Sequence, residues 1–429
     1  MKQKKISGMV ALSILLSSAP LAQADPQGHD HDGFFSHPFT LPLDTTGFSN
    51  GKAINFTVGV GSGAYHRPGD AADIIYTVSD RGVNIKCKDD IKVVGIDLCA
   101  SGKIFPVPSF SPTIYTFKAD SNGVHLIDAV QIKDQDGQVV SGLSNPLINT
   151  DTELAYDKNG SEIPLDPNGL DVESMLRLRD GSFWVSEEYA PSLVHIASTG
   201  EVLERRVPYG IDTDLSEANY PVAGSFPAIL AKRKLNRGME SVAVSGDEQF
   251  LYTSLQSPLA NPNKSAYKQS RNVRLLKTDR VTGAVLGEYV YRMDLPTSFA
   301  ADSSTKQSDV KVSEMAWYGD DELLILERIS KTTKLYRVKL TGATNILDSK
   351  WDQVTTSPSL EQTANLTTAG IIPLSKELAM DSSRDYPGML PSKLEGIALL
   401  SRERAILVND NDFGIKGAKT TFSQIELND

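Results

Sequence analysis

The chain has 429 residues, of which 40% are hydrophobic, and its formal net charge is −11 at pH 7. This excess of acidic residues argues against a nucleic-acid partner, because such a partner requires a basic face. After the first 24 residues no stretch is apolar for long enough to cross a bilayer, so we expect no membrane span in the mature chain.

Residues 1–24 have the pattern of a signal peptide. A start with three lysines precedes a short apolar core from Met9 to Leu16, and Ala22-Gln23-Ala24 forms a small-residue cleavage signal. We expect export and cleavage near Ala24, which leaves a periplasmic or extracellular protein. Removal of three lysines and no acid would change the formal charge from −11 to −14. The alternative is a retained N-terminal helix.

Residues 25–50 are polar, and we predict a flexible leader. It holds three of the six histidines, His29, His31 and His37. One interpretation is a metal-scavenging tail, and the other is an exposed segment without a function of its own. No spacing typical of acid–base chemistry occurs here, so we assign no chemistry to it.

Strand patterns begin at Ala53. Apolar residues alternate from Ile54 to Val60, and a second run from Ile74 to Val78 ends in a polar stretch that contains Asp80. We interpret these runs as a divergent copy of a repeated unit that recurs four times later in the chain.

The chain has two cysteines, Cys87 and Cys99. In an exported chain, an even number of cysteines at short separation predicts a disulfide. It would close a loop of roughly a dozen residues and stabilise the fold by about 3 kcal/mol in a chain-entropy estimate. The alternative is two free thiols.

The repeated unit is clearest from Gly169 to Tyr189. Glu173 precedes a short apolar run, Arg179-Asp180-Gly181 supplies a tight turn, and a second apolar run ends in Glu187-Glu188. Glu240, Glu314 and Glu395 lead three further copies, at spacings of 67, 74 and 81 residues. These copies end in Gln256, in Glu327-Arg328, and in the run from Asn409 to Asp412.

A hairpin brings its start and its end to the same edge, so each leading glutamate lies near the polar end of its own copy. Hairpins stacked around a ring would gather all these groups at one mouth. We therefore predict an all-β, single-domain β-propeller over residues 51–429. Six blades fit best, with five or seven as alternatives, and the C-terminal strand from Phe422 to Leu427 is expected to pair with an N-terminal strand to close the ring.

Five pieces of the sequence resemble the phytase-like family, whose members are often labelled "esterase-like activity of phytase family". The pieces are VSDRG (78–82), GLDVESM with WVSEEY (169–189), NRGMES with LQSP (236–258), LILER (324–328) and LEGIALL with VNDNDFG (394–414). The resemblance runs from Gly59 to Gly414 and implies a β-propeller, usually exported by bacteria, with a hydrolytic role. The chain departs from the family pattern where Ser174, Ser241 and Met315 follow the leading glutamates, because Gly is common there.

Carboxylates gathered at one mouth either acquire raised pKa values or bind a cation. Hard oxygen donors suit Ca²⁺, which can polarise a phosphoryl or carbonyl oxygen. The candidate metal ligands are Glu173, Glu314, Glu395, Asp410 and Asp80. The candidate catalytic residues are Glu187 and Glu240, one of which would act as general base, and Arg237 and Arg328, which would hold an anionic group. The alternative is a structural network in which the carboxylates neutralise the arginines.

Three hypotheses follow for the function. The first is a calcium-dependent exported hydrolase of phosphate or carboxylic esters, with a small anionic ester as its partner. The second is a non-catalytic propeller that binds a ligand or partner at the same face, and the third is a calcium-dependent lactonase. A serine-hydrolase elbow, an H-E-x-x-H motif, a P-loop and a dinucleotide fingerprint are all absent from the sequence.

Overall fold

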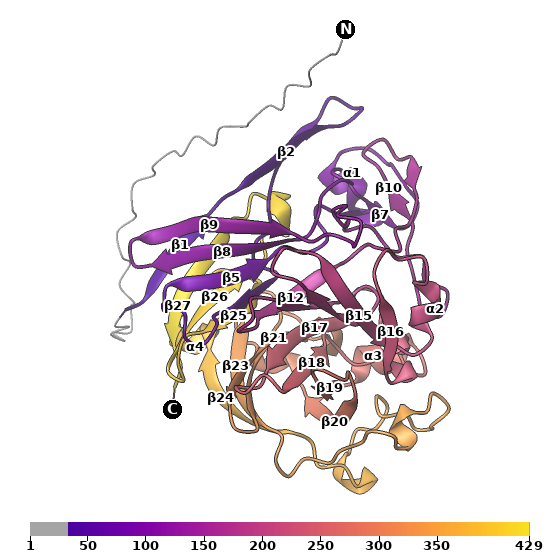
Figure 1. Cartoon of the computed structure of the whole chain (residues 1–429), viewed down its shortest axis with the longest axis vertical. Helices are drawn as coiled ribbons and strands as arrows, with labels where there is room; N and C mark the ends of the chain where they lie inside the picture. Colours follow the sequence, from indigo (N-terminus) through magenta and orange to yellow (C-terminus); the bar gives the residue numbers. More distant parts are fainter. Residues whose placement is uncertain (1–32, 429) are drawn as a thin grey trace. The chain divides into compact units, whose positions relative to one another are not determined.

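The structure is a computed structural model that describes residues 33–428. The predicted signal peptide, His29 and His31 lie outside the described residues. Most of the regular structure consists of β-strands, which confirms the all-β class (Figure 1). Between residues 33 and 428, no helix is long and apolar enough to cross a membrane.

Five sheets form the body of the fold (Figure 1). The first is β4 (Gly63–Tyr65), β5 (Ile74–Val78), β8 (Thr113–Asp120) and β9 (Gly123–Gln131). The second is β12 (Val172–Arg177), β13 (Phe183–Glu187), β14 (Ser192–Ile196), β15 (Val202–Pro208) and β16 (Val222–Phe226). The third is β17 (Met239–Val244), β18 (Phe250–Leu255), β19 (Asn272–Asp279) and β20 (Val285–Arg292).

The fourth sheet is β21 (Lys311–Gly319), β22 (Glu322–Arg328), β23 (Thr333–Lys339) and β24 (Ser375–Asp381). The fifth is β25 (Leu394–Leu399), β26 (Arg404–Asn409), β27 (Thr420–Glu426) and β1 (Phe35–Phe39). The first strands of these sheets contact one another in the cyclic order β4, β12, β17, β21, β25 and back to β4. The described residues therefore form a propeller of five blades, and the preferred prediction of six is wrong.

The ring closes through β1, which pairs antiparallel with β27 and joins the two ends of the chain in one blade. Pairing of the C-terminal strand with an N-terminal strand is thus confirmed. The prediction of a flexible leader up to residue 50 is wrong for its second half, because β1 and β2 (Pro42–Gly47) lie there. β2 pairs with β3 (Ala53–Thr57) in a separate hairpin, so the alternation that begins at Ile54 belongs to this hairpin and not to a blade.

A small sheet is inserted into the first blade and between the first two blades. Its strands are β6 (Ile85–Lys86), β7 (Lys103–Ile104), β10 (Ala155–Tyr156) and β11 (Glu162–Ile163), accompanied by η1 (Cys87–Asp89) and α1 (Asp90–Val93). Cys87 and Cys99 form the predicted disulfide within this insertion. The insertion explains why the long interval before Glu173 holds one blade.

Short helices occur in the loops between strands. The α-helices are α2 (Ile211–Asp214), α3 (Lys264–Gln269) and α4 (Ser382–Asp385). The 3₁₀ turns are η2 (Ala228–Lys232), η3 (Pro296–Ser298), η4 (Gln307–Asp309), η5 (Lys350–Asp352), η6 (Thr367–Ala369) and η7 (Asp412–Gly414).

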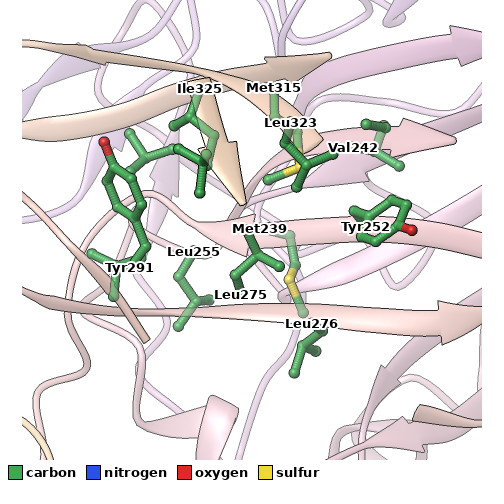
Figure 2. Packing of buried hydrophobic residues seen from close by; sticks show 14 of the residues in the cluster. Met239, Val242, Tyr252, Leu255, Leu275, Leu276, Tyr291, Met315, Leu323 and Ile325 are labelled. Carbon is green, nitrogen blue, oxygen red and sulfur yellow. The ribbon is translucent and has the colours of Figure 1, made fainter. Parts of the chain in front are cut away.

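The core lies between neighbouring blades, because each blade is covered on both faces. Met239 of β17 and Leu275 of β19 pack with Met315 and Leu323 of the next blade, and all four are at most 2% exposed (Figure 2). Burial of a side chain of this size stabilises a fold by roughly 1.5–3 kcal/mol. This packing holds the inner strands in place, and with them the polar residues at their ends.

Candidate active site at the strand-end mouth of the propeller

The inner strands of four blades begin with a β-bulge. In each case the pairing of the first two strands slips by one residue, at Glu173, Glu240, Ser313 and Glu395. A bulge turns the extra side chain away from the ladder, and bulges are common beside active sites. Three of the four bulged residues are glutamates that the sequence predicted as site residues.

The third copy differs from its prediction by one residue. Ser313 occupies the bulge, and Glu314 takes the position that Ser174, Ser241 and Gly396 hold in the other blades. Glu314 is 1% exposed, and it accepts hydrogen bonds from Ser174 Oγ at 2.5 Å and from its neighbouring Met315 N–H at 2.9 Å. It is therefore buried between blades and does not line the mouth, which leaves its prediction as a metal ligand without support.

The second strand of each blade ends at the same mouth. The strand registers make five residues equivalent there: Asp80, Glu188, Gln256, Arg328 and Asp410. Side chains alternate along a strand, so the residues that directly precede these five point away from the mouth. This alternation decides which of two adjacent carboxylates reaches the site.

Glu187 and Glu188 show the consequence. Glu187 is fully buried in its own blade, where it accepts from Arg205 at 2.7 Å, from Tyr189 N–H at 2.8 Å and from Ala190 N–H at 2.9 Å. The carboxylate of Glu187 is thus neutralised by Arg205 in a structural ion pair. Glu187 therefore does not line the mouth, whereas its neighbour Glu188 does.

The bulges and strand ends enclose a cavity of about 380 Å³, which we call the strand-end cavity. Six of the predicted site residues line it: Asp80, Glu173, Glu240, Arg328, Glu395 and Asp410. The predicted anion ligand Arg237 is not among the lining side chains, although its charge affects the pKa values of Glu240 and Lys311. Sequence reasoning missed several lining residues: Asp171, Glu188, Lys103, Lys311 and Lys393.

One side of the strand-end cavity is acidic. Carboxylate oxygens of Asp80, Asp171 and Glu173 lie within 4.8 Å of one another. Burial raises the pKa values of Asp80 and Glu173 well above those of ordinary carboxyl groups, and neighbouring carboxylates add to the effect, with Asp171 acting on both groups. Three oxygen donors at this separation can share one hard cation.

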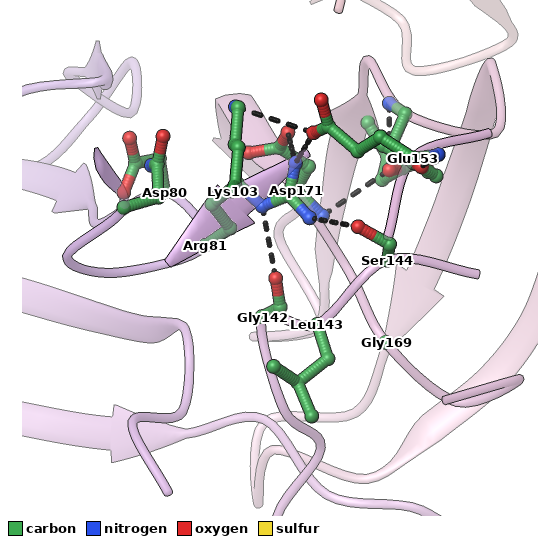
Figure 3. Close-up of polar contacts among 12 residues, drawn as sticks. Asp80, Arg81, Lys103, Gly142, Leu143, Ser144, Glu153, Gly169 and Asp171 are labelled. Atoms are coloured by element: carbon green, nitrogen blue, oxygen red, sulfur yellow. Dashed lines mark hydrogen bonds and ion pairs between the residues drawn. The ribbon is translucent and has the colours of Figure 1, made fainter. Parts of the chain in front are cut away.

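Arg81 holds this acidic group from behind. Its Nη1 donates to Asp171 at 3.2 Å, its Nε to the carbonyl oxygen of Gly142 at 2.9 Å and its Nη2 to Ser144 Oγ at 2.9 Å (Figure 3). Lys103 lies beside it and faces Glu153 at 3.6 Å (Figure 3). Arg81 is thereby fixed as a support for Asp171 and is not free to bind a substrate.

Three further oxygen atoms in the wall of the strand-end cavity lack a hydrogen-bond partner. Glu188 Oε2, Glu240 Oε2 and Gln256 Oε1 are buried and have no hydrogen-bond partner among the described residues. Burial raises the pKa of Glu188 to about 8 and that of Glu240 to about 7. Buried polar atoms are normally paired, so this oxygen-rich wall fits a hard cation better than it fits an empty space.

Basic residues line the strand-end cavity as well. Arg328 pairs with Glu395 and donates from Nε to Ser313 Oγ at 2.9 Å. Lys393 pairs with Asp412 and lies 3.6 Å from Asp410. Burial lowers the pKa of Lys311, and the nearby Arg237 and Arg328 lower it further. Arg328 and Lys393 thus bring their positive charge into the cavity as ion pairs, and Lys311 adds an amine that burial makes harder to protonate.

Comparison with known proteins identifies the family. Residues 57–413 match the family described as Phytase-like: Esterase-like activity of phytase. The chain belongs to this phytase-like family. A curated relative, an "Uncharacterized secreted protein" of Arthroderma benhamiae, is 24% identical over 288 residues, which are 60% of this chain and 54% of that protein. The phytase-like chain thus spans about half the length of this relative.

Several solved structures are similar over most of their length. RRP9 WD40 repeats match with a TM-score of 0.36 and 10% identity, covering 86% of this chain and 94% of that chain. The PQQ-bound aldose sugar dehydrogenase of Streptomyces coelicolor matches with a TM-score of 0.33 and 9% identity, covering 92% and 97%. Regucalcin of Agrobacterium tumefaciens matches with a TM-score of 0.30 and 11% identity, covering 87% and 95%.

Proposed function

We propose that this phytase-like protein is an exported, metal-dependent hydrolase of small anionic esters, with Ca²⁺ as the metal and phosphate or carboxylic esters as substrates. The observation that carries the proposal is that one cavity is lined both by converging carboxylates and by basic side chains. An ester with an anionic group needs both: a cation on the reacting oxygen and a positive contact for its charge.

Asp80, Asp171 and Glu173 are the proposed metal ligands, because their oxygens converge and because Asp171 and Glu173 are buried. When bound there, Ca²⁺ would act as a Lewis acid on a phosphoryl or carbonyl oxygen. The donors are all oxygens, which suits this ion.

The protein's own groups would do the rest. Lys311 and Arg328 would bind the anionic part of the substrate and hold it in position. Glu240 has an unpaired oxygen in the cavity wall and is the proposed general base, which would take a proton from the attacking water. Glu188 is the alternative for this role, because it also has an unpaired oxygen there.

Export is proposed from the pattern of residues 1–24, with cleavage near Ala24 and a periplasmic or extracellular location. The disulfide supports it, because such bonds persist in oxidising compartments. The name of the secreted relative supports it as well.

The test combines calcium titration with thermal melting of the mature protein. Calcium is expected to raise the Tm of the wild type, and this shift should be largely lost in Glu173→Gln, because one ligand charge is gone. Glu201→Gln is the matched control, since Glu201 is exposed and lies outside the strand-end cavity. Turnover of p-nitrophenyl phosphate, p-nitrophenyl acetate and a γ-lactone is then measured with calcium and with EDTA.

Hydrolysis that depends on calcium and disappears in Glu240→Gln supports the proposal. Lys311→Gln should raise KM for the phosphate ester more than for the acetate ester, because only the former carries a charge. A calcium-dependent Tm shift without turnover of any ester would instead favour a non-catalytic binding propeller. A Tm that does not respond to calcium would contradict the metal site itself.

A further inference from the structure

The propeller has a second and larger cavity at the opposite ends of the same inner strands. It has a volume of about 1180 Å³ and is lined by the hairpin turns of four blades and by the end of β4, and we call it the turn-side cavity. Its lining shares no residue with the strand-end cavity. This volume exceeds the range of about 300–1,000 Å³ that is usual for small-molecule pockets.

Aromatic side chains form part of the turn-side cavity. Tyr65, Phe250 and Trp317 line it, and each packs one side on the apolar core while remaining partly exposed on the other. Tyr252 and Tyr318 line it as well and are almost fully buried. Flat rings that are anchored in the core and open on one face suit stacking against another flat, partly apolar ring.

Trp317 is held rigidly in this arrangement. A Cβ atom placed on Gly246 would lie 2.6 Å from the indole Cη2, so the ring rests directly on the backbone of the neighbouring turn. Arg179 fixes that turn from the other side, because its side chain donates to the carbonyl oxygen of Gly246 at 2.5 Å and its N–H donates to Glu248 at 3.0 Å. A ring held in this way costs little entropy when a ligand stacks on it.

The charged residues of the turn-side cavity do not favour an anion. Four acidic and four basic residues line it: Asp247, Glu248, Asp320, Asp321, Arg67, Arg179, Lys277 and Arg402. The four basic groups already have partners. Arg67 pairs with Asp70, Arg179 with Glu248 and Arg402 with Glu322, and Lys277 lies 4.3 Å above the Phe250 ring. Two of the pairing carboxylates, those of Asp70 and Glu322, lie outside the lining, so the remaining surplus of charge at the cavity is acidic and disfavours an anion.

We propose that the turn-side cavity binds a neutral oligosaccharide. A sugar ring presents an apolar face that stacks on aromatic rings, and its hydroxyl groups pair with carboxylates such as Asp320 and Asp321. The volume accommodates more than one ring, and the surplus of carboxylates disfavours the anionic ligands that are expected at the strand-end cavity. The proposal does not depend on hydrolysis at that other mouth.

The test uses the mature protein and a panel of neutral oligosaccharides, with maltohexaose, cellohexaose, laminarihexaose and mannohexaose as the first probes. Of the three tryptophans, Trp184 and Trp351 are buried, so quenching of fluorescence by acrylamide reports mainly on Trp317. At least one neutral sugar is expected to bind in calorimetry and to protect Trp317 from quenching. Oligogalacturonate of the same length, which is anionic, is expected to bind more weakly.

Three variants separate binding from folding. Trp317→Ala should weaken binding by roughly tenfold or more, as for a central aromatic contact. Gly246→Ala keeps the indole but displaces it, and Asp320→Ala removes a turn carboxylate with little effect on the core, so both should weaken binding while the protein stays folded. Tyr209→Ala is the control, because Tyr209 is 60% exposed and lies outside the cavity.

Several results would overturn the proposal. These are the absence of binding across the neutral panel, stronger binding of oligogalacturonate, or unchanged affinity in both Gly246→Ala and Asp320→Ala.

Discussion

At the scale of single residues, two adjacent glutamates lie in different environments. Glu187 and Glu188 have the same chemistry, yet one is neutralised by Arg205 inside a blade and the other faces the strand-end cavity with an unpaired oxygen. The difference comes from strand alternation alone, because successive side chains point to opposite faces. A buried pair such as Glu187 with Arg205 tolerates the loss of either partner poorly, since the other charge is then left unpaired.

This contrast gives a prediction for Glu187→Gln. The change should lower the free energy of unfolding by about 3–5 kcal/mol, because Arg205 would remain buried without its counter-charge. The shift of Tm with calcium should persist in whatever fraction folds. Urea unfolding and calcium titration of this variant measure both quantities, and Glu201→Gln is again the control. A stable Glu187→Gln protein that has lost its response to calcium would restore Glu187 to the site.

At the scale of elements, the sequence predicted the hairpins but not the register in which their strands pair. The turn at Asp180-Gly181 and the polar strand ends predicted the hairpins correctly, and Val172 does pair with Glu187 as that geometry requires. The bulges were not visible, because an extra residue in one strand leaves the apolar pattern almost unchanged. A slip of one residue exchanges the two faces, which is why Glu314 was assigned to the mouth in place of Ser313.

Several charged lining residues were missed for a related reason. Asp171, Lys311 and Lys393 all stand two residues before a bulge position, so one alignment of the copies would have found them together. Lys103 has no such signal, because it comes from the inserted sheet and reaches the cavity through tertiary structure. Lining residues that belong to the repeated unit can thus be predicted from the sequence, whereas lining residues that come from an inserted segment cannot.

An element-scale prediction concerns the segment after β20. Asp294 accepts from Lys376 on β24 at 2.7 Å and from Tyr336 and Lys334 on β23 at 2.5 and 3.0 Å. Burial alone would raise the pKa of Asp294, but these donors outweigh it and hold the pKa well below that of an ordinary aspartate. The unfolded chain therefore binds the proton more readily, so this contribution to stability is present above about pH 4 and is lost as the pH falls further.

Asp294→Asn should therefore reduce the free energy of unfolding by about 1.5–3 kcal/mol at pH 7, the range for hydrogen bonds to a charged group. The difference from the wild type should shrink steadily below pH 4. Denaturant unfolding at a series of pH values measures it, with Asp136→Asn as a control at an exposed position. A difference that stays constant down to pH 3 would show that the carboxylate charge is not the cause.

At the scale of the whole molecule, the blade number could not be obtained from spacing. The inserted sheet and the β2–β3 hairpin take up chain outside the blades, so dividing the chain length by the spacing of the copies overestimates the blade count. Closure of the ring was predictable, because the C-terminal strand needs a partner and the chain supplies one near its start. This closure also brings Asp80 of the first blade and Asp410 of the last blade to the same cavity.

The closing strand should therefore control both stability and the strand-end cavity. We compare a chain that begins at Phe34 with one that begins at Leu41 and so lacks β1. Loss of β1 exposes the edge of β27 and removes Phe35, which is 7% exposed, from the core between the first and last blades. The shorter chain is expected to melt several degrees lower and to aggregate more readily.

The Tm of the shorter chain should also respond less to calcium, because the first and last blades that supply Asp80 and Asp410 are no longer held together. Thermal melting with light scattering, with and without calcium, distinguishes the two chains. Equal Tm values and equal calcium shifts would mean that packing between the inner strands β4 and β25 is enough to close the ring.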